Sequence, residues 1–530
     1  MKKRFLGILM ISIFLAVTPL LVCGQKTLTI LHTNDTHSAL FPFGPGDYYG
    51  GIARMSHLIK MLRSRNAHVL ALNAGDVFVG SFEFNKYLGY PELRIMQNLY
   101  DGMCLGNHEL DLGIDALTGV LSGVIPQDQP IALPVLCANI DLSSYPDLNS
   151  MIKPSLIKEI GGMKIGIIGV VNTDAQNYSP EVGALLTDPF QAAGVQAATL
   201  RAQGCNIVIC VSHLGKVYDV AGLSQVPGID IIVGGHSHDA LKKAILASGK
   251  IIVQAGEYGR WLGELKVTYD GQSVSLKSYT LHPVDGRIEN DPSLRRSLAL
   301  LRMGIVQDPR FGEVYTDRVA RADWTIDNEW KPGSSYRDTP LGDFGADAIR
   351  WGVQQAGYSV DMALDVTGYI VSKIYPGKVV GNDLLRVVPY GYDPGSGLGF
   401  KINIVELDGG TLLALLEYSV SMVEFTRDLC LDPSGITFKY DSSRPAAPLG
   451  QFSRLDPTSV MVNGSPINPM QLYKVAINEQ IYRTLLSLGV QPYSVTETGL
   501  FLYNVVRDYA RSLNHIRSKA EGRIIDTAVQ

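Results

Sequence analysis

Five short polar clusters in this chain contain the residue types that hold divalent metal ions in proteins. Their carboxylate, imidazole and amide side chains are together suited to a pair of ions. Such a pair can hold both the attacking and the leaving oxygen of a phosphoryl displacement. The clusters are Asp35-Thr36-His37, Gly75-Asp76, Asn107-His108-Glu109-Leu110-Asp111, His213 and Gly235-His236-Ser237-His238.

Each cluster has a simpler interpretation when it is taken singly. Asp35 could cap a helix while His37 lies at the surface, and Asp76 could belong to an ordinary turn. His236 and His238 could be two exposed imidazoles. The prediction of a metal site therefore depends on the whole set, because five such clusters in one chain are improbable by chance.

His108 has a different expected role from the other imidazoles. It follows Asn107, whose carbonyl oxygen is a neutral metal ligand, and it can face a substrate instead of a metal. Asp111, three residues later, could accept a hydrogen bond from the ring and fix its tautomer. His108 could then donate a proton to a leaving oxygen. A purely structural histidine is the alternative.

The clusters follow segments that have the pattern of buried strands. The expected strands are residues 27–31, 68–72, 164–170, 206–211 and 229–233, and helix-like stretches alternate with them up to about residue 263. Continuous apolar, β-branched runs indicate strands covered on both faces, so an α/β fold is expected. Chemical groups at the carboxyl ends of such strands are the general rule in α/β sheets.

The chain is too long for one compact core. Its 530 residues predict at least two domains. We expect a first domain over 25–290, a linker helix over 291–310 and a second domain over 311–530, with a strand near 400–405 and a helix near 411–418.

The N-terminus has the pattern of an export signal. Basic residues at positions 2–4 precede an apolar stretch at 5–22, and cleavage ahead of Gln25 would remove a signal peptide of residues 1–24. A membrane anchor is the alternative, because the stretch is nearly long enough to span a bilayer. Pro19 and the polar residues after position 24 favour cleavage, which predicts a periplasmic or cell-surface protein with no stable membrane span.

Composition limits the partners. The net charge is −5 and no stripe of basic residues is present, which argues against a nucleic-acid polymer as substrate. A small phosphorylated substrate remains compatible, because bound metal ions reverse the local field. The six cysteines include no CxxC pair, so a sulfur-ligated metal is not expected.

At the level of motifs the chain resembles the 5'-nucleotidase family, which includes UDP-sugar hydrolases and cyclic-nucleotide phosphodiesterases. The matching segments span the first domain: LHTNDTH at 31–37, GGIAR at 50–54, NAGDVFVGS at 73–81, GNHELD at 106–111, PVLCANI at 134–140, VSHLG at 211–215 and GHSH at 235–238. The resemblance implies a four-layer αββα metallophosphoesterase domain, joined by the linker helix to a smaller α/β (α+β) substrate-binding domain.

The resemblance also implies roles for individual residues. His108 and Asp111 would form the catalytic dyad, and a metal-activated water would attack phosphorus. Zn²⁺ and Mn²⁺ both suit the mixed oxygen and nitrogen ligands. Two divalent ions would bind, one to Asp35, His37, Asp76 and His238, the other to Asp76, Asn107, His213 and His236.

The second domain matches the family's substrate-binding domain with several replacements. Asp343 stands where the family has asparagine, and Val371 stands where the family has an anion-binding arginine. The family's two base-stacking aromatic groups are not at their usual motif positions. Stacking contributes about 1–3 kcal/mol per base in nucleic-acid complexes. Candidates to replace it are Tyr369, Tyr390, Tyr392 and Tyr482.

Three hypotheses follow. The first is an exported dimetal hydrolase that releases phosphate from nucleotides, in nucleotide catabolism. The second is the same catalytic domain acting on another small phosphoester or pyrophosphate, such as a UDP-sugar or a cyclic nucleotide. The third is a metal-containing surface protein without catalysis, against which the presence of His108 and Asp111 argues. The resemblance further predicts that the linker helix lets the second domain carry substrate toward the metals.

Overall fold

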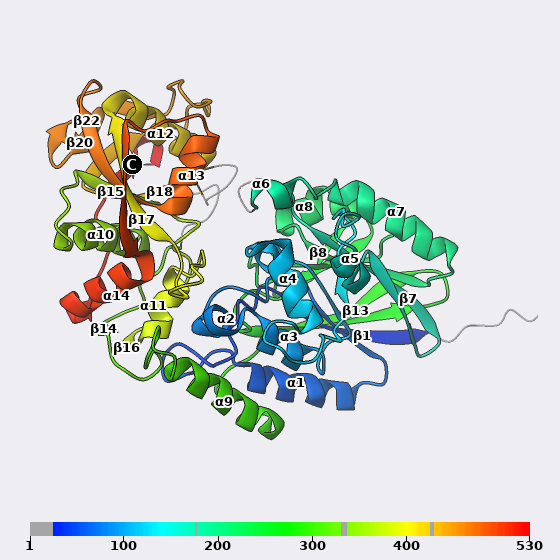
Figure 1. The fold of residues 1–530 in the computed structure, drawn as a ribbon. Helices are drawn as coiled ribbons and strands as arrows, with labels where there is room; N and C mark the ends of the chain where they lie inside the picture. The colour runs from blue at the N-terminus through cyan, green and yellow to red at the C-terminus, as the bar shows by residue number, and fades with distance from the viewer. Residues whose placement is uncertain (1–24, 175–177, 330–335, 424–428, 530) are drawn as a thin grey trace, which may run out of the picture.

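The computed structural model describes residues 25–174, 178–329, 336–423 and 429–529, so the expected signal peptide at 1–24 lies outside the described residues. The chain forms two lobes, with the N-terminal half in one and the C-terminal part in the other (Figure 1). Across the described ranges, no helix has both the length and the apolar character needed to cross a bilayer.

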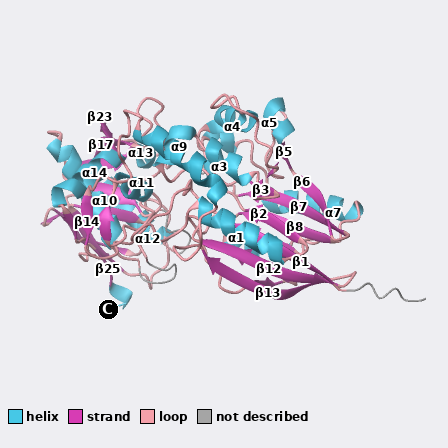
Figure 2. Ribbon diagram, turned by 90° about the horizontal axis from the view of Figure 1, so that it is seen from below, coloured by secondary structure: helices cyan, strands magenta, loops and turns pink. Residues whose placement is uncertain are grey.

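Two mixed sheets form the centre of the first lobe. Within the described residues, one has seven strands in the order β13 (Val274–Pro283), β12 (Trp261–Tyr269), β1 (Lys26–Thr33), β2 (Val69–Asn73), β3 (Gly102–Cys104), β4 (Val135–Leu136), β5 (Ile152–Lys153). The other has six strands in the order β10 (Ile245–Ala247), β11 (Lys250–Gln254), β9 (Ile231–Gly234), β8 (Ile207–His213), β7 (Met163–Val171), β6 (Ser155–Ile160). Figure 2 shows β13, β12 and β1 as neighbouring strands at one side of this lobe.

The two sheets pack face to face between layers of helices. In β8, Ile207, Ile209 and Val211 belong to the core between the sheets, while Val208 and Cys210 pack on the helical side. This alternation follows from the period of two along a strand. The covering helices are α7 (Pro189–Ala202) on the second sheet and, on the first, α1 (Ile52–Arg65), α3 (Tyr90–Met96) and α4 (Gly113–Ser122). The expected four-layer αββα arrangement is therefore present.

Parallel pairing brings the polar clusters to one edge. β1, β2 and β3 pair in parallel in the first sheet, and β7, β8 and β9 do so in the second. Each cluster begins just beyond or at the carboxyl end of one of these strands. The strands predicted from apolar runs correspond to β1, β2, β7, β8 and β9, with bounds that differ by up to two residues.

The second lobe also contains mixed sheets with helices. Its largest described sheet has the order β18 (Leu431–Ser434), β15 (Met362–Val366), β22 (Leu472–Asn478), β17 (Lys401–Asp408), β23 (Ser494–Phe501). Smaller sheets are β21 (Ser465–Pro466), β20 (Leu455–Val462), β19 (Ile436–Tyr440), β25 (Ile524–Asp526) and β16 (Gly377–Val379), β14 (Ala320–Ala322), β24 (His515–Ile516). The helices are α10 (Pro340–Gln355), α11 (Gly381–Val387), α12 (Gly409–Met422), α13 (Glu479–Ser487) and α14 (Leu502–Leu513).

The helix α9 (Arg295–Val306), preceded by a short 3-10 turn at Pro292–Leu294, lies within the stretch predicted as a linker. Close to it, the short helix α2 (Phe82–Tyr87) of the first lobe reaches the second. The ring of Phe82 is buried in the core of the second lobe, 5.3 Å from the ring of Tyr503. Its backbone N–H donates to Asn382 on α11. The two lobes therefore share apolar core as well as polar contacts.

The other α-helices described in the first lobe are α5 (Pro146–Met151), α6 (Pro180–Gly183) and α8 (Lys216–Ala221).

Candidate metal centre and active site

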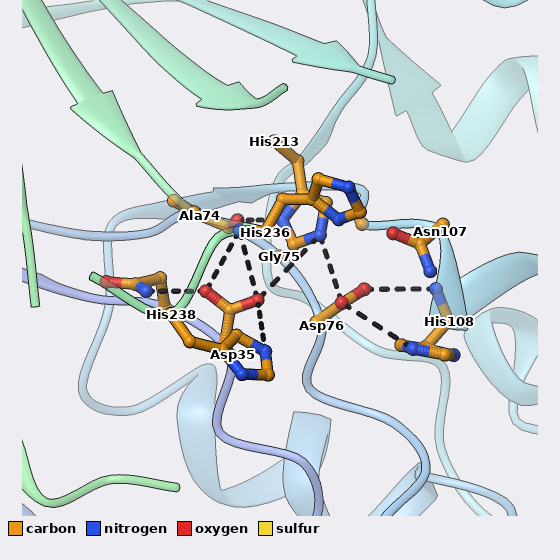
Figure 3. Close-up of polar contacts among 12 residues, drawn as sticks. Asp35, Ala74, Gly75, Asp76, Asn107, His108, His213, His236 and His238 are labelled. Atoms are coloured by element: carbon orange, nitrogen blue, oxygen red, sulfur yellow. Dashed lines mark hydrogen bonds and ion pairs between the residues drawn. The ribbon is translucent and has the colours of Figure 1, made fainter. Parts of the chain in front are cut away.

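The side chains proposed as metal ligands lie on tight loops at the ends of strands, except His213, which is the last residue of β8. Six of the seven are labelled close together in Figure 3: Asp35, Asp76, Asn107, His213, His236 and His238. These loops depend on backbone conformations that most residues avoid. Gly75, with φ +83°, passes so close to Gly106 that an added Cβ would lie 2.5 Å from its nitrogen. Five of the ligand candidates have positive φ, an uncommon conformation for non-glycine residues. They are Asp35, His37, Asp76, His236 and His238.

Three groups of ligand atoms converge at this edge, each spanning no more than 4.8 Å. One contains Asp35, His37 and His238, where the two imidazole Nε2 atoms are 3.1 Å apart. Asp76, His213 and His236 form another. The third joins His37 and Asp76 with His108, which places Asp76 between the other two groups. This division resembles the two ligand sets expected from the sequence.

His213 has the features of a metal ligand. Its Nδ1 lies 2.6 Å from the carbonyl oxygen of Ala74 and donates to it. In the neutral ring, Nε2 therefore carries the free electron pair. Nε2 is buried and lies 3.0 Å from Asp76 Oδ2, with which it pairs when the ring is protonated. A neutral ring would present the electron pair of this nitrogen to the same space. A divalent ion between this nitrogen and the carboxylates fits the site.

The charges of the site are strongly coupled. Burial favours the neutral form of Asp76, yet His213 and His108 hold the pKa of this carboxyl well below its usual value. Burial also opposes charge on His213, but Asp76 and Asp35 raise its pKa to about 9. His37 shows the opposite balance, because burial and the neighbouring His238 lower its pKa to about 4. The carboxylates are thus held ionised, as metal ligands must be.

Asn107 lies at the same edge and is linked to His236 through the side chain of Asn172. Its side-chain oxygen accepts a hydrogen bond of 3.0 Å from Asn172, which itself lies 3.5 Å from Nδ1 of His236. The structure therefore brings together all seven residues predicted as ligands. Asn172 was not singled out from the sequence, because it follows β7 without a carboxylate or imidazole beside it.

The predicted dyad has the expected geometry. Nδ1 of His108 lies 2.8 Å from Oδ2 of Asp111, and its Nε2 lies 3.9 Å from Oδ2 of Asp76. Burial disfavours charge on the ring, but Asp111 and Asp76 raise the pKa of His108 to about 9. The imidazole is thereby kept protonated near neutral pH, so it can donate a proton or stabilise negative charge.

Sequence reasoning missed two carboxylates that support the site. The carboxylate of Glu109 accepts four backbone hydrogen bonds, from the N–H groups of Gly106, Asp76, Val77 and Phe78, at 2.6–3.1 Å. It ties the loop after β2 to the loop after β3. Glu257 lies 2.8 Å from Nδ1 of His238 and so orients that imidazole. Glu109 stands inside a motif quoted above, and its role could have been sought there. Glu257 carries no local signal.

Of the four tyrosines considered for base stacking, the structure brings two near the site. The ring of Tyr390 is stacked on His108, with centroids 5.0 Å apart and planes inclined by 15°. Tyr369 meets Tyr390 edge-on at 6.1 Å. Tyr392 instead packs on Phe84. Tyr482 packs against a separate core cluster of the second lobe.

The replaced family positions have structural partners within the second lobe. Asp343 lies 3.5 Å from Arg523, and its pKa is raised to about 9 by burial despite that guanidinium. The backbone N–H of Val371 donates to Val387 at the end of α11. Neither residue belongs to the groups of ligand atoms at the metal centre.

Comparisons with known proteins match both lobes. The sequence profile of calcineurin-like phosphoesterases covers residues 28–240, and that of the 5'-nucleotidase C-terminal domain covers residues 321–483. A trifunctional nucleotide phosphoesterase protein of Bacillus subtilis (strain 168) is 27% identical over 94% of this chain, which spans 35% of that protein's length. The 5'-nucleotidase of Homo sapiens is 25% identical, with 94% of this chain and 91% of the human protein covered.

A solved structure agrees over nearly the whole length of the chain. The crystal structure of a 5'-nucleotidase precursor from Thermus thermophilus is 28% identical in sequence and superposes with a TM-score of 0.81. The match covers 95% of this chain and all (100%) of that one. With a calcineurin-like phosphoesterase domain followed by a 5'-nucleotidase C-terminal domain, the chain is a phosphoester hydrolase and belongs to the 5'-nucleotidase family.

Proposed function

We propose that this chain is an exported enzyme that releases phosphate from nucleotides with the help of two divalent metal ions. The observation that best supports the proposal is that two groups of ligand atoms share Asp76. Beside it lies the imidazole of His108, which is paired with Asp111. A site that only stabilised the fold would have no need of the His108–Asp111 pair.

Each group of ligand residues would hold one ion. Asp35, His37 and His238 would hold one ion, and His213 and His236 with the amide of Asn107 would hold the other. Asp76 would bridge them. When bound, the ions would supply the Lewis acidity that activates water and offsets the charge of a phosphate. Both Zn²⁺ and Mn²⁺ suit this donor set.

His108 would act on the leaving group. Asp111 accepts from Nδ1, so the proton on Nε2 faces the space beside Asp76. From there it can be passed to the oxygen that departs from phosphorus, a transfer worth about 10²–10⁴-fold in rate. Tyr390, stacked on the ring, brings the second domain to the reacting centre.

A nucleotide is the substrate class that we favour. Its support is the similarity to a nucleotide phosphoesterase and a 5'-nucleotidase, together with the aromatic pair Tyr390 and Tyr369 beside His108, which offers ring faces near the site. A second candidate is another small phosphoester or pyrophosphate, such as a UDP-sugar or a cyclic nucleotide. It is favoured by Val371, which supplies no charge where the family has an arginine.

Export is proposed from the N-terminal pattern of three basic residues and an apolar stretch before Gln25. Expression of the full chain, followed by mass determination of the secreted or surface-bound product, tests it. A product that begins at or near Gln25 agrees with the proposal. A protein that keeps Met1 and stays inside the cell contradicts it.

The activity is tested by phosphate release from an aryl phosphate in the presence of Mn²⁺, Zn²⁺ or Co²⁺. His108→Ala should lose turnover and keep its metal. A matched control is His515→Ala, because His515 makes the same kind of pair, 2.9 Å from Asp323, in the second domain. A panel of nucleoside mono- and diphosphates, cyclic nucleotides and sugar nucleotides then separates the two substrate classes. Full activity of His108→Ala would refute the assigned role.

A further inference from the structure

An arginine of the second domain is buried among aromatic rings of the first, beside the metal centre. Arg386 lies near the end of α11 and is only 4% exposed. Its guanidinium carbon is 3.5 Å from the ring centroid of Phe43 and 5.4 Å from that of Tyr258. Tyr375 of the second domain completes the cluster, 6.1 Å from Phe43.

This arginine has unusual surroundings for a buried cation. Among the described residues Arg386 forms no ion pair within 4.0 Å, and its Nη2 atom makes no hydrogen bond. Burial lowers the pKa of Arg386, although Asp383 and Tyr258 oppose the change. Taking a guanidinium out of water without a paired carboxylate is costly. The faces of the rings are the compensation that the structure offers, since cation–π attraction strengthens when water is excluded.

Both sides of this contact lead directly to the active site. On the first domain, the Tyr258 ring lies 5.5 Å from the His37 ring, and its backbone N–H donates to the carbonyl of Asp35 at 2.7 Å. On the second domain, Arg386 is four residues before Tyr390, the residue stacked on His108. The arginine thus joins the loop that carries metal ligands to the segment that covers the catalytic imidazole.

We propose that Arg386 is an interdomain positioning residue, which holds α11 and Tyr390 against the metal centre through Phe43 and Tyr258. It would set the arrangement of the two domains in which a nucleotide reaches the metals, so this inference rests on the proposed function. Arg386 itself would not touch the substrate. Its guanidinium is enclosed by protein and packed on the first domain's rings.

Two other roles would give different results. If Arg386 only stabilised the fold of the second domain, loss of Phe43 in the first domain would not reproduce its effect on turnover. If Arg386 bound an anionic part of the substrate, Arg386→Leu would impair nucleotide hydrolysis whether or not Phe43 was present. The interdomain role predicts that Arg386→Leu and Phe43→Leu have similar effects, and that the double variant is no worse than either.

The kinetic test compares a nucleoside monophosphate with phenyl phosphate, which has no nucleoside for the second domain to bind. Arg386→Leu and Phe43→Leu should each lower kcat/KM for the nucleotide about 30-fold, the factor for about 2 kcal/mol. Phenyl phosphate turnover should change less than about threefold, by the same conversion below 1 kcal/mol. Arg386→Lys keeps the charge, so its kcat/KM for the nucleotide should lie between those of the parent protein and Arg386→Leu. The matched control is Lys519→Leu, because Lys519 lies over Trp324 entirely within the second domain, 5.1 Å from its ring centroid.

A distance measurement tests the inference without reference to activity. All described cysteines are buried, so cysteines introduced at exposed positions can be spin-labelled selectively. Val195 on α7 and Met470 in the second domain are 57% and 89% exposed. Arg386→Leu and Phe43→Leu should each broaden or shift the distance distribution between these labels, and Lys519→Leu should leave it unchanged.

Unchanged distances together with unchanged nucleotide kinetics in a folded Arg386→Leu protein would overturn the inference. So would additive losses in the double variant, since they would mean that the two residues act separately. Should Arg386→Leu not fold, Arg386→Lys and Phe43→Leu carry the same comparison. Should the parent protein hydrolyse no nucleotide, the proposed function fails, and the distance measurement still decides the role of Arg386.

Discussion

Replacement of Glu109 by glutamine tests how the metal-binding loops are held together. In the structure Oε1 of Glu109 accepts from the N–H groups of Val77 and Phe78, and Oε2 accepts from those of Asp76 and Gly106. The carboxylate is 3% exposed, so water cannot take over these bonds. Glutamine has one oxygen and an NH₂ group in the same space. It can serve only one of the two pairs.

The size of the effect follows from the groups left without an acceptor. Two buried N–H groups would face an amide donor, and each costs about 1–3 kcal/mol, giving about 2–6 kcal/mol in all. One term opposes this loss. Burial and the nearby Asp76 charge raise the pKa of Glu109, so a neutral side chain relieves some repulsion. We therefore expect Glu109→Gln to lower the free energy of unfolding by about 2–4 kcal/mol.

Denaturant unfolding at a fixed Mn²⁺ concentration measures this change, and titration of the metal-free protein measures affinity. Since Glu109 orients the loop of Asp76, we expect Mn²⁺ affinity to fall about 10–100-fold, as for other residues behind metal ligands. Glu159→Gln, an exposed glutamate on β6, is the control. The four hydrogen bonds to Glu109 have no energetic role if the free energy of unfolding of Glu109→Gln is within about 0.5 kcal/mol of the parent's and Mn²⁺ binds equally well.

Four further predictions concern individual groups. Asp111→Asn should lower kcat about 10²-fold without changing the Mn²⁺ affinity, because it disturbs only the imidazole that carries the proton; equal losses in both would contradict this. Glu257→Gln should weaken Mn²⁺ binding about 10–100-fold, since it no longer fixes His238 as a ligand. A chelator should lower the melting temperature, because the free energy of ion binding to the folded chain is then lost, and added Mn²⁺ should restore it. Burial raises the pKa of Glu92 from 4.5 to about 8, so the folded state keeps a proton that the unfolded chain loses, and stability should fall as pH rises between these values. Glu92→Gln should flatten this fall in unfolding experiments at several pH values; an unchanged slope would contradict the assignment.

The sequence was sufficient to single out candidate metal ligands because the position of several of them follows from a simple rule. Buried parallel strands are recognisable as apolar, β-branched runs, and polar groups at their carboxyl ends meet at one edge. Asp35 after β1 and Asp76 after β2 could therefore be grouped by this rule alone. His213 ends β8 of the other sheet, so its place beside them depends on how the two sheets pack. The family resemblance then supplied the four-layer αββα arrangement and the substrate-binding role expected of the second domain.

The residues that sequence reasoning missed act across contacts that no local pattern encodes. Glu109 matters because its carboxylate meets N–H groups of another loop, more than 30 residues away. Arg386 matters only because the second domain lies where Phe43 can reach it, more than 300 residues earlier in the chain. Of four candidate tyrosines, the choice of Tyr390 likewise required the placement of one domain on the other.

The backbone at the metal centre adds a constraint that composition and spacing could not suggest. Asp35, His37 and Asp76 have φ values of 49°, 47° and 52°, in the left-handed region where a side chain costs about 1 kcal/mol or more per residue. The N–H of His37 donates to the carbonyl of Asp76 at 3.0 Å, so the two strained loops hold each other. This backbone strain disfavours the edge in the metal-free chain, where the imidazoles of His213 and His108 balance the charge of Asp76. Ions that bind there would offset the strain and hold both loops, and for this reason we expect metal binding and the stability of these loops to be inseparable.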